Sequence, residues 1–172
     1  QGLTLFDPST QKYITTSYNR NNSSSLSDDF VYDILKDNEG GLWITTYFGG
    51  INYSNPNSSN FTIRHCATES ARGRIISKFH EDKNGDIFIG TDDGGLFIYN
   101  PIKDKCHRYT IDKSNPNLNI HAIWSNDTYL WIGTYSKGLY RINHKTKYVE
   151  HIPYFEKDGI TNESIYSIHE DL

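Results

Sequence analysis

The sequence predicts an all-β fold: a β-propeller fragment of four-stranded antiparallel blades, with three complete blades flanked by partial ones. A unit of forty-odd residues recurs along the chain, and its glycine landmark stands at Gly50, Gly95 and Gly138, in steps of 45 and 43 residues. Aromatic residues make up 14% of the 172 residues, and flat rings pack well on a pleated sheet. No stretch shows a sustained helical period, so we expect little helix.

Each repeat contains four successive predicted strands. The first carries one large apolar residue in a fixed column (Ile34, Phe79, Ile123, Ile168). The second is apolar on both sides, as a blade buried between two neighbours requires, and it includes Trp43, Phe88 and Trp131, which we interpret as core residues. The third runs from the glycine landmark to Asn-Pro, where proline ends the ladder. The fourth, outer strand is expected at 61–66, 105–111 and 148–153.

Turn residues stand where hairpins are needed. The glycine landmarks supply positive φ between strands two and three, and Asn84-Gly85 is a strong turn signal between strands one and two. An aspartate recurs before this first turn, and capping of the turn explains it (Asp37, Asp82, Asp171).

We expect one propeller segment excised from a larger sensor. The predicted divisions are a partial blade at 1–18, blades at about 27–66, 73–111 and 119–153, and a partial blade at 163–172. The chain starts with a third strand and ends with a first strand, so a closed ring of four blades would lack a second strand, the most apolar one. An open arc within a larger propeller is therefore favoured, and the absence of methionine agrees with an excised piece.

Charge and hydropathy narrow the function classes. Aspartate plus glutamate outnumber lysine plus arginine by 21 to 17, which gives a net charge of −4. No polycationic surface is predicted, so we expect no direct contact of this segment with nucleic acid. No apolar stretch approaches the roughly 18 residues of a membrane span.

The repeat resembles a known family. The pattern Ile-x-x-Ile-x-x-Asp, a turn, Leu-Trp-Ile-Gly-Thr and Gly-Gly-Leu closely resembles the two-component regulator propeller repeat, best at 82–96 and 130–139. The resemblance implies the periplasmic sensor region of a hybrid two-component system, whose histidine kinase lies elsewhere in the parent protein. It also implies an oligosaccharide ligand and control of polysaccharide-utilisation genes.

Two other readings of the propeller stay open. It can serve protein–protein assembly, including dimerisation of the receptor, or it can be part of a glycan lyase or hydrolase. No Gly-x-Ser-x-Gly elbow, P-loop or His-Glu-x-x-His motif occurs, so we expect no enzyme, no catalytic residue and no cofactor in this segment. The remaining blades of the parent chain are expected partners.

One rim of the propeller is the predicted ligand face, because loops on a rigid scaffold carry function. It combines the turns between strands two and three with the interblade connections at 67–74, 112–119 and 154–162, where residues vary between blades. The candidate ligand residues are aromatic, acidic or basic (Tyr47, Phe48, Arg72, Arg74, Asp92, Asp93, Tyr135, Lys137). Rings stack on sugar C–H faces, and the basic groups suit a sulfated or uronic glycan.

His65-Cys66 and Cys106-His107 lie on predicted outer strands of adjacent blades. Their spacing matches no compact metal motif, so we expect no metal site. A Cys66–Cys106 disulfide is also not expected, because adjacent outer strands splay apart at the rim of a propeller.

Overall fold

A computed structural model describes residues 2–58, 60–64, 66, 75–152 and 164–171, and this part of the chain contains 14 strands and no helix. No segment of the described chain is therefore a helix that could cross a membrane. The all-β prediction is confirmed.

The strands form one hairpin and three four-stranded antiparallel sheets. The hairpin consists of β1 (Leu3–Asp7) and β2 (Lys12–Thr16). The first complete sheet contains β3 (Val31–Lys36), β4 (Leu42–Thr46), β5 (Gly50–Ser54) and β6 (Phe61–Arg64). The second contains β7 (Ile76–Glu81), β8 (Ile87–Thr91), β9 (Leu96–Asn100) and β10 (Lys105–Tyr109). The third contains β11 (Ile120–Ser125), β12 (Tyr129–Thr134), β13 (Leu139–Asn143) and β14 (Val149–Ile152).

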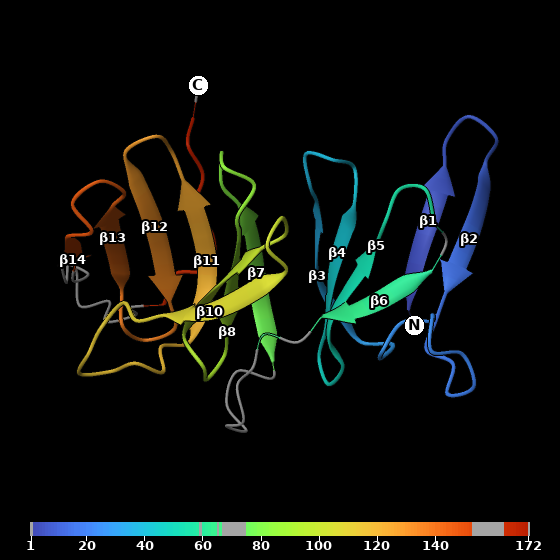
Figure 1. Cartoon of the computed structure of the whole chain (residues 1–172), viewed down its shortest axis with the longest axis horizontal. Coiled ribbons are helices and arrows are strands. Elements are labelled where there is room, and N and C mark those ends of the chain that lie inside the picture. Colours follow the sequence, from blue (N-terminus) through green and yellow to red (C-terminus); the bar gives the residue numbers. More distant parts are fainter. Residues whose placement is uncertain (1, 59, 65, 67–74, 153–163, 172) are drawn as a thin grey trace, which may run out of the picture.

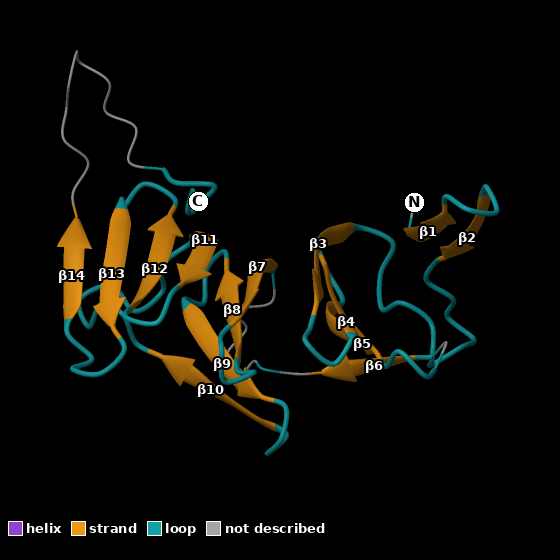
Figure 2. Ribbon diagram, turned by 90° about the horizontal axis from the view of Figure 1, so that it is seen from above, coloured by secondary structure: helices purple, strands orange, loops and turns teal. Residues whose placement is uncertain are grey.

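The sheets stand side by side (Figure 1) and follow an arc when they are seen from above (Figure 2). Seen from above, the first strands β3, β7 and β11 lie on the inner side of the arc, and the fourth strands β6, β10 and β14 lie outside (Figure 2). Each sheet keeps its strands in sequence order, which is the arrangement of a propeller blade.

The apolar cores lie between blades. One cluster joins the first and second complete blades and includes Trp43 and Ile89, and another joins the second and third and includes Phe88 and Ile132. Ile87 and Ile89 therefore face one neighbour while Phe88, between them on β8, faces the other. This two-sided burial is why the second strands are apolar throughout.

The large apolar residue that recurs in each first strand is buried only where the preceding blade is complete. Phe79 and Ile123 are buried against the blade before them, whereas Ile34 is 48% exposed. The sheet before Ile34 is the hairpin β1–β2, which has no first or second strand to cover it. Trp43 and Phe88 are core residues as predicted, and Trp131 of the last complete blade is half-buried beneath the guanidinium of Arg141.

The predicted turns are confirmed. Gly50, Gly95 and Gly138 have φ of 76°, 78° and 67° in the hairpins between strands two and three. The Oδ1 atom of Asp82 accepts hydrogen bonds from the Asn84 and Asp86 N–H groups, at 2.8 and 3.0 Å. Asp37 caps its own turn in the same way.

Residues 164–171 carry the sequence pattern of a first strand but form no strand. The Ile165 N–H still donates to the Thr134 carbonyl at 2.9 Å, so the segment begins against the third complete blade. A strand needs a ladder partner, and no second strand lies beside this segment in the described chain.

Candidate functional site

Each complete blade carries a β-bulge near the start of its first strand. The register shifts between Val31 and Asp33, between Ile76 and Lys78, and between Ile120 and Ala122. The bulged residues are therefore Tyr32, Ser77 and His121. A bulge frees one residue from the ladder and re-aims its side chain, and bulges are frequent beside binding sites.

The turn after the second strand is held next to this bulge by one repeated backbone hydrogen bond. Tyr47, Asp92 and Tyr135 occupy the same position in the three blades, and their N–H groups donate to the Phe30, Ile75 and Asn119 carbonyls at 2.9, 3.0 and 2.9 Å. The bond joins the start of the turn to the residue just before the first strand. The side chains of turn and bulge consequently share one rim.

Aromatic contacts connect the two positions. The Tyr32 and Tyr47 ring centroids are 6.4 Å apart, and Tyr47 and Phe48 lie 4.6 Å apart edge to face. The His121 ring lies 6.0 Å from the Tyr135 ring and 5.2 Å from the Tyr166 ring. We call this set the rim cluster: Tyr32, Tyr47, Phe48, Asp92, His121, Tyr135 and Tyr166.

An acid–imidazole contact lies within the rim cluster. Asp92 Oδ1 is 3.2 Å from His121 Nε2, yet it is buried and its geometry fits no hydrogen bond in the described chain. Burial, followed by the charge of Asp92 and the neighbouring Tyr47 and Tyr166 hydroxyls, raises the pKa of Tyr32 above its usual value of 10. The Tyr166 hydroxyl thus contributes to the raised pKa of Tyr32, although the two residues belong to repeats three units apart.

The rim cluster contains four of the predicted ligand residues: Tyr47, Phe48, Asp92 and Tyr135. Phe48 is 76% exposed, whereas Asp92 is half-buried. Asp93 and Lys137 are exposed on the same turns, and the Lys137 carbonyl contacts His151 Nε2 at 2.8 Å. Arg72 and Arg74 lie outside the described residues, as do the connections at 67–74 and 154–162.

The sequence reading missed Tyr32, His121 and Tyr166, because a residue inside a predicted first strand was expected to pair or pack. The signal was nevertheless present. The position after the first apolar residue of this strand reads Tyr, Ser, His and Tyr in successive repeats, while its neighbours repeat. In the second blade the residue is Ser77, which is buried and donates its hydroxyl to the Ile120 carbonyl of the next blade.

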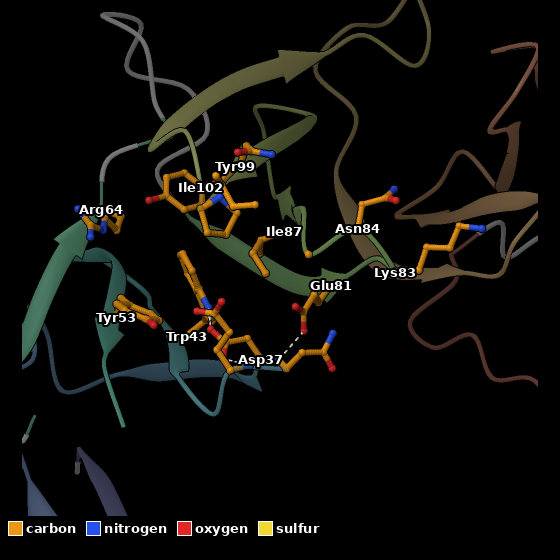
Figure 3. A pocket seen from close by; sticks show the side chains of 15 residues that line it. Asp37, Trp43, Tyr53, Arg64, Glu81, Lys83, Asn84, Ile87, Tyr99 and Ile102 are labelled. Atoms are coloured by element: carbon orange, nitrogen blue, oxygen red, sulfur yellow. Dashed lines mark hydrogen bonds between the residues drawn. The ribbon is translucent and has the colours of Figure 1, made fainter. Parts of the chain in front are cut away.

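A cavity of about 390 Å³ lies on the opposite face, between the first two complete blades (Figure 3). Its lining comes from the turns between strands one and two, such as Asn38 and Asn84, from β4 to β9, and from the turn after β9. Sequence reasoning placed function on the other rim and did not anticipate this cavity, because a cavity depends on how two blades pack.

The cysteine expectation was wrong. Cys66 and Cys106 form a disulfide, with Cα atoms 5.3 Å apart. Cys66 follows the end of β6 and Cys106 lies in β10, so the bond joins adjacent blades where we expected their outer strands to be too far apart. Both cysteines pack against the apolar cluster between these blades, which draws the outer strands together. Both sulfur atoms are used in this bond, so neither cysteine offers a free thiolate to a metal ion.

Comparisons with known proteins agree with this architecture. Residues 25–48 match the family model described as two component regulator propeller. The match covers β3, β4 and the connection before them with the buried Leu26, rather than the two stretches singled out above. No curated protein matches the chain.

Solved structures share the fold at low sequence identity. The extracellular domain of BT4673 from B. thetaiotaomicron, described as a hybrid two component system, is 24% identical, with a TM-score of 0.67 over 90% of this chain and 19% of its own. That of BT3049, described in the same way and from the same organism, is 21% identical, with a TM-score of 0.56 over 99% of this chain and 28% of its own. PorZ, a surface component of the type-IX secretion system of Porphyromonas gingivalis, is 14% identical, with a TM-score of 0.69 over 98% of this chain and 26% of its own.

This chain therefore spans about a fifth to about a quarter of the length of these solved chains. At these sequence identities the similarity to solved structures establishes the fold alone. The family model identifies the type of repeat at residues 25–48. The chain has the fold of a β-propeller fragment, and its residues 25–48 match the two component regulator propeller repeat.

Proposed function

We propose that this chain is a ligand-sensing segment of an extracytoplasmic, periplasmic propeller in a hybrid two-component system, and that it binds oligosaccharide through the rim cluster without chemical turnover. The exposed rings beside the Asp92–His121 contact carry the proposal. Tyrosine and phenylalanine rings offer faces for sugar C–H groups, while the carboxylate and imidazole offer hydrogen bonds to hydroxyls. In the parent protein, ligand binding would be relayed to a histidine kinase that controls polysaccharide-utilisation genes.

Two observations support the extracytoplasmic location. The similar structures from B. thetaiotaomicron are described as extracellular domains. The Cys66–Cys106 disulfide fits an oxidising compartment, since cytosolic reductants keep most thiols free.

We further propose that other blades of a longer parent chain cover the hairpin β1–β2. Its exposed apolar residues form an unusual surface for a free edge (Leu5, Phe6, Tyr13, Ile14), each between 56% and 73% exposed. The small share of the similar solved chains that this chain spans supports the same proposal.

The test is a binding screen of the 172-residue chain against plant and host oligosaccharides by saturation-transfer NMR, with affinities of the hits measured by calorimetry. Tyr135→Ala should weaken binding of a hit about tenfold, which is the loss of one stacked ring at about 1–1.5 kcal/mol. The matched control Tyr13→Ala, an exposed tyrosine on β2, should bind normally. If both variants bind equally well, the rim cluster is not the binding site. If a cleaved product is released, the chain is an enzyme and not a sensor.

A further inference from the structure

The cavity on the opposite face has two walls from different blades. Tyr53 of β5 and Arg64 of β6 form one wall, and Tyr99 of β9 and Ile102 form the other. Trp43 forms the floor and is 2% exposed. At about 390 Å³ the cavity is within the size range of small-molecule sites.

An aromatic strip crosses the cavity from blade to blade. The Trp43 ring centroid lies 4.7 Å from that of Tyr53 and 5.2 Å from that of Tyr99. Figure 3 shows Trp43 between these tyrosines, with Arg64 on one side of the strip and Glu81 on the other side. Trp43 and Tyr99 are 2% and 5% exposed and form a closed base, whereas the half-buried Tyr53 offers part of its ring to a flat, partly apolar ligand.

Arg64 brings an unused donor to this strip. Its Nη1 atom is 3.6 Å from Asp104 Oδ1, and that same oxygen accepts the Tyr99 hydroxyl at 2.5 Å. Its Nε atom is buried and makes no hydrogen bond within the described chain. The Arg64 side chain as a whole is 36% exposed, so the N–H groups at the end of its guanidinium can donate to a ligand in the cavity.

The carboxylates of the cavity divide into committed and available groups. Asp37 is committed, because it accepts from the Glu39 and Gly41 N–H groups and from Trp43 Nε1 at 2.8 Å. Glu39 is exposed at the mouth, and Glu81 accepts from the Asn38 N–H across the blade boundary at 3.0 Å, which leaves both able to accept from a ligand.

The charge balance of the cavity selects the ligand class. The acids at and beside the cavity outnumber the bases, Arg64 and Lys83 (the acids are Asp37, Glu39, Glu81 and Asp104). A sulfated or uronic ligand would be repelled, whereas a neutral ring with hydroxyls can accept from Arg64 and donate to Glu39 and Glu81.

We propose that this interblade cavity is a second saccharide site, which binds one or two neutral sugar units against the ring of Tyr53, with a ring or hydroxyl oxygen accepting from the Arg64 guanidinium. The inference rests on the proposed saccharide sensing for its ligand class alone, since no residue is shared with the rim cluster.

The disulfide links the two walls of this site. Cys66 stands two residues after Arg64, and its bond to Cys106 ties β6 to β10, the outer strands of the two blades that form the walls. A site whose walls are already fixed loses less conformational entropy when it binds.

The test uses four neutral disaccharides as probes: cellobiose, lactose, maltose and diacetylchitobiose. Saturation-transfer NMR and chemical-shift titration of the 172-residue chain should show binding of at least one, with shifts at the Trp43 indole N–H. Arg64→Gln should weaken that binding about tenfold or more, because it removes a charged donor. Tyr53→Phe, which keeps the ring, should weaken it less than Tyr53→Ala.

Arg141→Gln is the matched control, since Arg141 is also half-buried and paired with an acid, Glu150, but lies in the third blade. Binding that is lost in Tyr135→Ala and kept in Arg64→Gln would overturn the second site while leaving the rim proposal standing. Binding lost in Arg64→Gln and kept in Tyr135→Ala would support the second site and count against the rim. Preference for a uronate or sulfated disaccharide, or no binding of any of the four probes to a folded chain, would overturn the inference.

Discussion

At the residue scale, single positions set how closely two blades approach. A Cβ atom added at Gly90 would lie 2.7 Å from Ile120 Cγ2 of the next blade, and one at Gly133 would lie 2.6 Å from Ile165 Cγ2. The first complete blade has Thr45 at this position, and there the hydroxyl accepts from the Asp33 N–H at 2.8 Å. Glycine therefore permits close packing in the second and third complete blades, whereas in the first the threonine side chain binds the backbone at the bulge.

Gly90→Ala should cost about 1–3 kcal/mol in the free energy of unfolding, because the added methyl overpacks the interface between β8 and β11. Urea denaturation monitored by tryptophan fluorescence measures it. Ile120→Ala removes the clashing Cγ2 atom, so the double variant should be more stable than the sum of the two single losses predicts. Strict additivity would show that the two residues do not meet.

At the element scale, hydrogen bonds and one covalent bond join neighbouring sheets. Asp33 of β3 accepts from the Phe79 N–H at 3.0 Å and contacts Lys78 Nζ at 3.3 Å, both in β7. On the outside, the disulfide joins Cys66 to Cys106, 40 residues later. The interface between the first two complete blades is thus fastened at its inner and outer edges.

Replacing both cysteines by alanine should lower the free energy of unfolding by about 2–4 kcal/mol, since the cross-link restricts the unfolded chain. Urea denaturation of the variant, and of the native chain in a reducing agent, should give similar losses. Mass spectrometry after thiol alkylation provides the independent check: two alkylated cysteines in the non-reduced native chain would refute the bond.

At the scale of the whole molecule, groups in different blades define the pH range of greatest stability. Burial lowers the pKa of His80, on β7, below its usual 6.5, and its Nε2 contacts Ser125 Oγ at 2.7 Å. Hydrogen bonds from Ser9 and Thr10 lower the pKa of Asp7 to about 2. Burial and then the hydrogen bond to Asp104 raise the pKa of Tyr99 to about 12.

The signs of these shifts predict a plateau of stability. A histidine with a lowered pKa stabilises the fold above its usual 6.5 and loses this contribution as the pH falls below that value. The Asp7 contribution is lost further down, between 3.8 and about 2, and the Tyr99 contribution is lost as the pH rises from 10 toward 12. Denaturant titrations across this range should show a plateau between about 6.5 and 10, and His80→Gln should remove the first decline on the acidic side. An unchanged acidic decline in that variant would assign it to other groups.

The architecture could be predicted because the repeat is local. Gly50, Gly95 and the apolar second strands report turns and burial within one blade, and they needed no knowledge of its neighbours. The exposure of Ile34, the Cys66–Cys106 bond and the cavity beside Arg64 depend on how two blades meet. That geometry is set by side chains some forty residues apart, so spacing along one blade did not reveal it.

The bulge in each first strand has a consequence for how such a protein can diversify. Because Tyr32 and His121 stand outside the ladder, the backbone bonds of their blades do not depend on which side chain they carry. A mutation there changes the chemistry offered to a ligand and leaves the scaffold intact, one blade at a time. A duplicated gene could in this way acquire a new specificity through a few substitutions, without passing through an unstable intermediate.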